Sequence, residues 1–121
     1  MIKRIKFIGI PVGDQDRALE FYTQKLGFRI LTDQPLTPTQ RWIELSIPGA
    51  DTGVALFTPE GHENRIGTFV NTSWEVENVD KTYEALLAKG IEFTAPPVKQ
   101  PWGTSVIMKD SDSNTIVLAS R

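Results

Sequence analysis

Apolar residues follow two different spacings in the first part of the chain. Residues 5–12 alternate at a period of two, which predicts a strand. The next apolar residues have the three- and four-residue spacing of one helical face: Ala18, Leu19, Tyr22 and Leu26. Asp14 offers the side-chain oxygen of a good N-cap, and Gly27 stands where a left-handed residue ends a helix. The chain therefore begins with a predicted strand and a predicted helix.

Period-two patterns return after this helix. Three strands are expected, at 28–32, 41–47 and 54–58. In the second of them, Trp42 and Glu44 fall on the face opposite the apolar one. The segment 33–40 contains two prolines and is expected to be a loop. The first half of the chain thus has the element order βαβββ.

The same order of elements occurs a second time. The strands expected in the second half are 68–76, 91–94, 105–109 and 115–119. A helix between the first two starts after Asn78 and ends at Gly90. Asn78 follows Asp14 by 64 residues and Gly90 follows Gly27 by 63, so the offset is nearly constant. The sequence therefore contains an internal repeat.

This repeat predicts the fold class. We expect an α+β domain, 1–121, of two tandem βαβββ modules that span about 1–58 and 67–121. Each module has a helix on one face of its sheet, and the two opposite faces would form a curved mixed sheet around a cleft. A polar loop, 59–65, would join the modules.

Composition limits the kinds of function that are possible. With 121 residues and 40% hydrophobic positions, the chain can bury a core without disulfides, and it has no cysteine. The formal charge is 13 − 15 = −2, which does not favour a nucleic-acid partner. No apolar run is long enough to cross a membrane, so a cytoplasmic protein is expected. The single histidine, His62, excludes a site that requires two or three imidazoles.

Several motifs resemble those of one superfamily. Residues 10–12 read Ile-Pro-Val, residues 26–28 read Leu-Gly-Phe, and residues 74–76 read Trp-Glu-Val. Residues 101–103 read Pro-Trp-Gly, and 109–114 read Lys-Asp-Ser-Asp-Ser-Asn. In this order and spacing, the chain resembles the vicinal oxygen chelate superfamily, which contains glyoxalase I, extradiol dioxygenases, and fosfomycin and bleomycin resistance proteins. The resemblance covers essentially the whole chain.

The resemblance implies where a metal would be held in relatives. The ligand positions carried over to this chain are Phe7, Ala55, Asn71 and Val117. Three of these side chains have no donor atom, and a lone asparagine carbonyl is a poor ligand for a transition metal. We therefore expect no metal and no other cofactor. Glyoxalase, extradiol dioxygenase and fosfomycin transferase chemistry is doubtful for the same reason.

The bleomycin resistance branch implies another function, the metal-independent binding or sequestration of a small molecule by a homodimer. The ligand-binding residues that we expect are Phe7, Trp42, Glu44, Phe57, Asn71, Ser73 and Trp102. Aromatic side chains in this set suit a flat aromatic or apolar ligand. Glu44 is also a weak candidate for a catalytic residue.

Two other interpretations remain open. The first is a lyase, isomerase or oxygenase with a non-standard site at Glu44, Glu75 or His62. The second is a cleft filled by the protein's own aromatic side chains.

Each candidate also has a simpler explanation. Glu44 and Glu75 could be solvated or paired with basic residues, namely Arg41, Lys99 or Lys109. His62 could bind a metal with Glu60 and Glu63, but a polar loop with glycine is more often solvated. The residues Asp110, Asp112 and Asn114 resemble part of a calcium loop, but they lack its glycine and distal glutamate and are interpreted as a turn.

Overall fold

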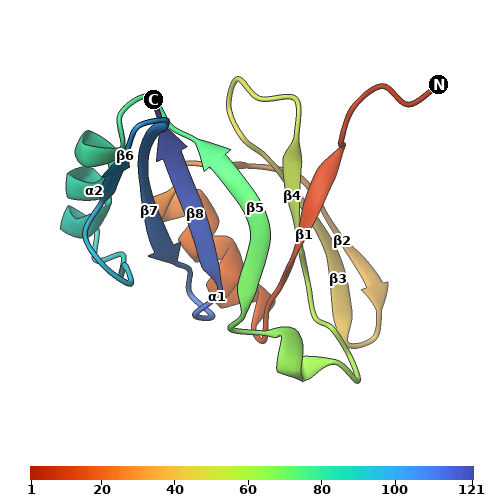
Figure 1. The fold of residues 1–121 in the computed structure, drawn as a ribbon. Helices are drawn as coiled ribbons and strands as arrows, with labels where there is room; N and C mark the ends of the chain where they lie inside the picture. Colours follow the sequence, from red (N-terminus) through yellow and green to blue (C-terminus); the bar gives the residue numbers. More distant parts are fainter. The chain divides into compact units, whose positions relative to one another are not determined.

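The computed structural model describes residues 1–121 as two compact units, Met1–Ile66 and Gly67–Arg121 (Figure 1). Unit 1 contains β1 (Phe7–Pro11), α1 (Gln15–Glu20), the π-helical segment η1 (Phe21–Lys25), β2 (Arg29–Thr37), β3 (Gln40–Ser46), β4 (Gly53–Phe57) and the short 3-10 helix η2 (Glu63–Arg65). Unit 2 contains β5 (Phe69–Glu75), α2 (Val79–Ala88), β6 (Val98–Gln100), β7 (Gly103–Lys109) and β8 (Thr115–Ser120).

Both units have the same sheet topology. In unit 1 the strand order is β1-β4-β3-β2, and β1 and β4 are the parallel pair. In unit 2 the order is β5-β8-β7-β6, and β5 and β8 are parallel. The predicted α+β fold of two tandem βαβββ modules is confirmed, with two four-stranded mixed sheets, neither of them closed.

The helix ends lie where the sequence predicts them. The Asp14 carboxylate accepts a hydrogen bond from the backbone N–H of Arg17 at 3.0 Å. In unit 2 the Asn78 side chain accepts one from the N–H of Lys81, also at 3.0 Å. Gly27 has φ +76° and Gly90 has φ +83°, the left-handed conformation that favours glycine after a helix.

The first helix differs from the prediction in its second half. It is α-helical from Gln15 to Glu20 and then widens into a π-helical segment, Phe21–Lys25. Thr23 donates its hydroxyl hydrogen to the carbonyl of Leu19 at 2.7 Å. A hydroxyl that bonds four residues back competes with the helical ladder, which accounts for the local change in spacing.

The predicted loop 33–40 is wrong. Most of it belongs to β2, which continues to Thr37, and the hairpin turns only at Pro38 and Thr39. β2 is the edge strand of its sheet, so the missing N–H of Pro35 removes no hydrogen bond that another strand needs. The register of β2 against β3 shifts between Pro35 and Thr37, which takes up the irregularity.

The predicted strand 91–94 is also wrong. This segment makes only an isolated bridge, between Phe93 and Met108. The Phe93 ring packs edge-on against Tyr83 of α2 at 4.8 Å between ring centroids, so its side chain is held by the helix rather than by a ladder. The fourth strand of unit 2, β6 (Val98–Gln100), follows Pro96 and Pro97 in a segment where the sequence predicts no strand.

The apolar face of each sheet forms a core. In unit 1 the fully buried strand residues include Ile10, Ile43, Leu45, Val54 and Leu56. In unit 2 the corresponding residues are Val106, Met108, Ile116 and Leu118. These residues alternate with less buried ones along β3, β7 and β8, as a sheet with one buried face requires.

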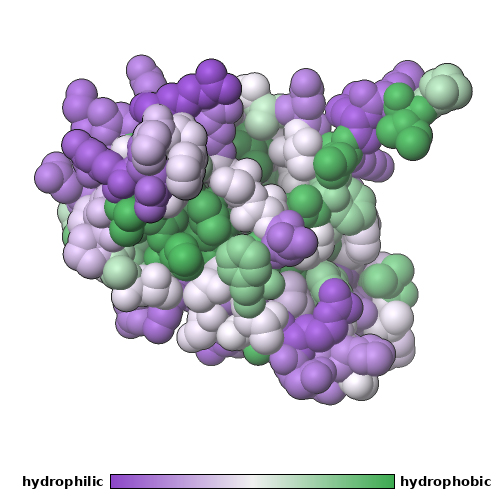
Figure 2. Space-filling view, in the orientation of Figure 1, coloured by the Kyte–Doolittle hydropathy of each residue, from purple (hydrophilic) through white to green (hydrophobic).

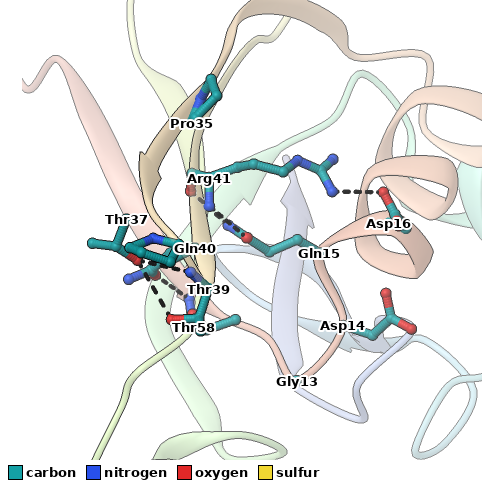
Figure 3. Close-up of a pocket in the computed structure, with 11 residues that line it drawn as sticks. Gly13, Asp14, Gln15, Asp16, Pro35, Thr37, Thr39, Gln40, Arg41 and Thr58 are labelled. Carbon is teal, nitrogen blue, oxygen red and sulfur yellow. Dashed lines mark hydrogen bonds and ion pairs between the residues drawn. The ribbon is translucent and has the colours of Figure 1, made fainter.

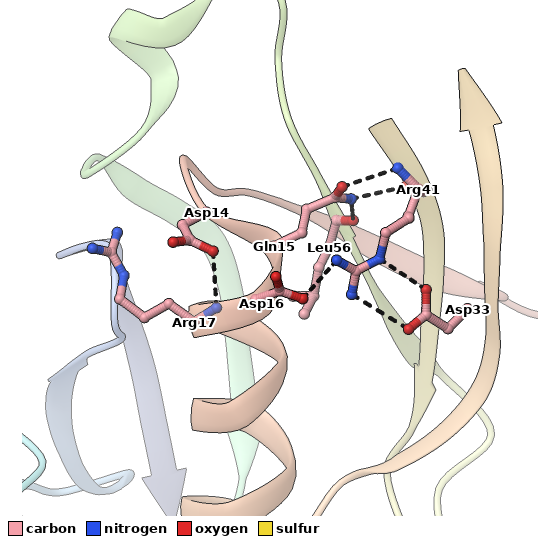
Figure 4. A network of polar contacts seen from close by, with 7 residues as sticks. All are labelled: Asp14, Gln15, Asp16, Arg17, Asp33, Arg41 and Leu56. Carbon is pink, nitrogen blue, oxygen red and sulfur yellow. Dashed lines mark hydrogen bonds and ion pairs between the residues drawn. The ribbon is translucent and has the colours of Figure 1, made fainter. Parts of the chain in front are cut away.

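A buried amide joins α1 to two strands of unit 1. Gln15 is the first residue of α1, and it donates to the carbonyls of Arg41 at 2.8 Å and Leu56 at 3.0 Å. Its carbonyl oxygen accepts from the N–H of Arg41 at 3.0 Å (Figure 4). The paired register of β3 and β4 ends at Ile43 and Leu56, so the amide satisfies backbone groups beyond the last strand pair.

Arg41 makes a second connection on the same side of the sheet. Its guanidinium donates to Asp16 of α1 at 2.6 Å and to Asp33 of β2 at 3.0 Å and 3.3 Å (Figure 4). The hydrogen bonds with Asp33, and then with Asp16, raise the pKa of Arg41. The Asp16 side chain is 84% exposed, so this pair orients the two elements more than it stabilises them.

The N-terminal residues 1–6 precede β1 and extend from unit 1 (Figure 1). Ile2 and Ile5 are exposed, and apolar atoms are visible on this arm in Figure 2. The carbonyls of Ile5 and Lys6 accept hydrogen bonds from the Thr52 hydroxyl and the Gly53 N–H, which anchors the arm beside β4. None of the helices has the length and apolar character needed to cross a membrane.

Replacing Gln15 with methionine tests the buried amide. The substitution Gln15→Met keeps a side chain of similar length but leaves the N–H and carbonyl of Arg41 and the carbonyl of Leu56 without this partner. We expect the free energy of unfolding to fall by about 2–4 kcal/mol in urea titrations followed by tryptophan fluorescence. The control is Gln24→Met at an exposed position, which should change it by no more than about 0.5 kcal/mol. Equal effects of the two substitutions would contradict the role given to Gln15.

A second substitution tests the close approach of β4 to β3. A Cβ at Gly53 would lie 2.4 Å from the backbone carbonyl oxygen of Leu45, so Gly53→Ala must push two paired strands apart. We expect a loss of about 1–3 kcal/mol in the free energy of unfolding, measured by thermal or urea denaturation. Gly9→Ala should cost less, because its Cβ would meet the ring of Phe57 at 3.0 Å and a side chain can move. The reverse order would show that the contact at Gly53 is relieved easily.

Candidate functional site

The unit 1 sheet has one face turned away from α1. Arg41 contacts Asp16 of α1, so the side of β3 that bears Arg41 is the helix side. Side chains alternate along a strand, which places Trp42 and Glu44 on the opposite side. The strand register extends this side across the sheet. We call it the open face and define it by Phe7, Gly9, Trp42, Glu44, Ala55 and Phe57.

Small residues form the middle row of the open face. Glu44 pairs with Ala55 of β4, and Ala55 pairs with Gly9 of β1. On the other side of β3, Glu44 pairs with Thr32 of the edge strand β2. The row therefore runs from glycine through alanine to a carboxylate. The β1 end of the row, Gly9 and Ala55, therefore has no side chain larger than a methyl group.

Two aromatic rings meet across this row. Phe7 lies one step away from the row on β1, and Trp42 lies one step away on the other side, on β3. Their ring centroids are 5.5 Å apart at an interplanar angle of 70°, an edge-to-face pair. Ala55 is only 2% exposed. The two long side chains therefore reach toward each other over Ala55, whereas Gly9 stays exposed.

Phe57 stands beside the same row at the end of β4. Its ring lies against Gly9, where an added Cβ would be 3.0 Å from the ring. The guanidinium of Arg65 lies over this ring, 5.9 Å from its centroid. Phe57 is thus already in contact with a cation of the protein itself.

Glu44 is half-buried on the open face, and the structure gives its carboxylate no hydrogen bond and no ion pair. Its possible partner Arg41 lies on the other side of β3, where it bonds to Asp16 and Asp33. Arg29 pairs with Ser46 in the strand register and forms no ion pair with Glu44. Glu44 is therefore a carboxylate on an aromatic surface with its acceptor atoms uncommitted.

In unit 2 the sequence-predicted residues lie on one side of β5 and in a turn. Asn71, Ser73 and Glu75 alternate along β5 and are exposed, and Ser73 pairs with Val117 of β8. Glu75 forms no ion pair with Lys99 or Lys109. Trp102 lies in the turn between β6 and β7 and is 78% exposed. The structure brings Asn71 and Ser73 onto one face of β5. Trp102 lies at the tip of the β6–β7 hairpin, and β8 separates this hairpin from β5.

The sequence does not predict a groove in unit 1 between the start of α1 and the β2–β3 hairpin (Figure 3). It has a volume of about 460 Å³, and its lining includes Asp14, Gln15, Thr39, Arg41 and Thr58. Most polar groups here bond to one another, including the Gln40 side chain, which accepts from the Thr58 N–H at 2.7 Å. One signal could have indicated it: Gln15 is a polar residue that falls on the apolar helical spacing of Ala18, Leu19 and Tyr22.

The carboxylates near His62 serve the loop itself. Glu60 accepts a hydrogen bond from the Thr39 hydroxyl at 2.8 Å, and Glu63 accepts one from the N–H of Gly61 at 3.1 Å. Backbone hydrogen bonds from Glu63 itself and from Gly61 lower the pKa of Glu63. No group of three or more histidine, aspartate or glutamate side chains in the chain is arranged to hold a metal ion.

The acidic segment near the C-terminus forms a hydrogen-bonded turn. One oxygen of Asp110 accepts from the N–H groups of Asp112 and Asn114, both at 2.9 Å, and the other accepts from the Asn114 amide at 3.0 Å. The Asn114 carbonyl oxygen accepts from the N–H of Gly67 at 2.8 Å. Asn114 is fully buried, and these bonds close the turn between β7 and β8 onto the start of unit 2.

The positions expected to correspond to metal ligands do not fit a metal. Phe7 and Ala55 have no donor atom, and the two aromatic rings cover Ala55. Val117 has no donor atom either, and Asn71 alone would offer an uncharged carbonyl oxygen. We therefore assign no step in any reaction to a metal at these positions.

Comparisons with known proteins agree with this architecture. YetH of Bacillus subtilis (strain 168) is 36% identical over 121 residues, which cover 98% of each chain. The structure of a glyoxalase/bleomycin resistance protein/dioxygenase superfamily member from Sphaerobacter thermophilus DSM 20745 has a TM-score of 0.89 at 33% identity and covers 99% of this chain and 98% of that one. TnmS3, an antibiotic binding protein from Streptomyces sp. CB03234, has a TM-score of 0.82 at 29% identity, with coverage of 97% and 94%.

An enzyme is also among the similar proteins. A putative lactoylglutathione lyase of Brassica oleracea var. gemmifera is 30% identical over 128 residues, which cover 98% of this chain and 45% of the lyase. The family model of the Glyoxalase/Bleomycin resistance protein/Dioxygenase superfamily matches residues 4–118. With nearly its whole length matched and the paired βαβββ units in place, the chain belongs to the Glyoxalase/Bleomycin resistance protein/Dioxygenase superfamily.

Proposed function

We propose that the protein binds and sequesters a small molecule without a metal, as proteins of the bleomycin resistance type do. The observation that carries the proposal is the Phe7–Trp42 ring pair on the open face of unit 1. Both rings are partly exposed, so part of their surface is available to a ligand. The similarity to the antibiotic binding protein TnmS3 supports the same class of function.

The chemistry of the open face favours a flat aromatic or apolar ligand. Aromatic rings gain from offset or edge-to-face contact with a second ring in addition to the area that they bury. Gly9 and Ala55 add almost no side-chain bulk to the middle row, so the rings of Phe7 and Trp42 protrude above it and form an apolar ridge. In this proposal the ligand lies on that ridge, with Phe57 at its side.

In unit 2 the proposed ligand-binding residues are polar side chains of β5 and one exposed tryptophan. In the proposal the side chains of Asn71 and Ser73 form hydrogen bonds with polar groups of the ligand, since both are exposed on the same face of β5. Trp102 lies at a hairpin tip and is 78% exposed, so its ring is available for an aromatic contact. The proposal also includes a homodimer and a cytoplasmic location, which sedimentation and cell fractionation would test.

Titration with acridine, a flat three-ring probe, tests the binding function. Isothermal titration at pH 8 in buffer with EDTA should show saturable binding, because no proposed contact involves a metal. Phe7→Leu should weaken binding about two- to twelvefold, the range expected for loss of one aromatic contact of about 0.5–1.5 kcal/mol. Leu87→Ala, a truncation of an exposed residue on α2, is the control and should leave binding unchanged.

The same experiment separates binding from catalysis. Acridine recovered unchanged after incubation agrees with sequestration. Absence of saturable binding, or binding that EDTA abolishes, would contradict the proposed function. Equal binding by Phe7→Leu and the parent protein would show that the aromatic ridge is not the binding surface.

A further inference from the structure

Glu44 is the one acidic residue among the side chains that define the open face. On β3 it is two residues from Trp42, so the two side chains leave the same side of the strand about 7 Å apart. Its cross-strand neighbours on this face are Ala55 and Thr32, neither of which carries a charge. The carboxylate is half-buried without a hydrogen bond or an ion pair.

The nearby cations of unit 1 are placed so that they do not neutralise Glu44. Arg41 directly precedes Trp42 on β3, and its side chain is held on the helix side of the sheet by Asp16 and Asp33. Arg29 of β2 pairs with Ser46 and is exposed, and it makes no ion pair with Glu44. A half-buried carboxylate without a partner is a place where a positively charged ligand group gains a charge-assisted hydrogen bond.

The aromatic rings beside Glu44 also favour a positive charge. The faces of phenylalanine and tryptophan rings attract cations, and tryptophan does so most strongly. Phe57 follows Leu56, which pairs with Ile43, so it is on the same side of the small row as Trp42. Its ring lies against Gly9 of β1 and carries the guanidinium of Arg65 at 5.9 Å. The open face therefore has a cation over the Phe57 ring, which leans toward β1, and an uncompensated carboxylate on β3, so its positive and negative charges lie over different strands.

We propose that the open face selects aromatic cations, with the ring system on the Phe7–Trp42 pair and the positive group, a protonated or quaternary amine, at the Glu44 carboxylate. This inference rests on the proposed binding function and adds a charge requirement to it. The Arg65 side of the face repels the same positive group, so the ligand binds with its cationic end toward β3. Glu44 repels an aromatic anion of the same size, which therefore binds more weakly than the cation.

Three probes of equal ring size separate charge from shape. They are 10-methylacridinium, a permanent cation, acridine, which is uncharged at pH 8, and 9-anthracenecarboxylate, an anion. Isothermal titration at pH 8 and low salt should give about tenfold tighter binding for the cation than for acridine, and weaker binding for the anion than for the cation. Addition of salt should weaken binding of the cation and leave acridine nearly unchanged.

The variant Glu44→Gln removes the charge and keeps the shape. We expect it to bind 10-methylacridinium about tenfold more weakly and acridine with unchanged affinity. Glu20→Gln, at an exposed position on α1, removes the same charge elsewhere and should change neither affinity. Unfolding in urea before the titrations identifies any variant that does not fold, and Glu44→Asp then serves as a second variant that should keep the preference for the cation.

The outcomes distinguish this inference from the function on which it rests. If acridine and 10-methylacridinium bind equally well, and Glu44→Gln changes neither, the charge requirement is wrong and the binding function stands. If no probe binds, the proposed function itself is wrong. If Glu20→Gln weakens binding of the cation as much as Glu44→Gln, the preference comes from net charge rather than from the open face.

Discussion

The architecture of unit 1 depends on one buried amide. The Gln15 side chain occupies a place where β3 and β4 have ceased to pair, and it satisfies backbone groups of both strands in the way that a further strand residue would. Because Gln15 is also the first residue of α1, the same three hydrogen bonds fix the helix on one side of the sheet. The other side is thereby left to Phe7, Trp42 and Glu44.

Local chemistry made much of the fold predictable. N-caps, helix-ending glycines and period-two alternation depend on neighbouring residues, and Asp14, Asn78, Gly27 and Gly90 all act as expected. The errors occur where tertiary position overrides local preference. Pro35 is tolerated because β2 is an edge strand, and the segment around Phe93 makes only one bridge to β7 while its ring packs on α2. Neither circumstance can be known before the strand order is known.

The candidate site shows the same division. Alternation along β3 was enough to place Trp42 and Glu44 on one face, since side chains alternate in any strand. The contact between Phe7 and Trp42 could not be foreseen, because it spans two strands and requires the register through Ala55. Pairing of Arg41 with Asp16 and Asp33 was equally hidden, because it joins three elements.

The covering of Ala55 by two rings also bears on how such a chain can evolve. A single change of Ala55 to glutamate would place a carboxylate under Phe7 and Trp42, where an ion without a partner is costly. A functional metal donor at this position would first require smaller residues at 7 and 42, and each of those changes alone removes apolar contact. The aromatic pair therefore disfavours a metal ligand at position 55, because the substitutions that would uncover this position pass through less stable intermediates.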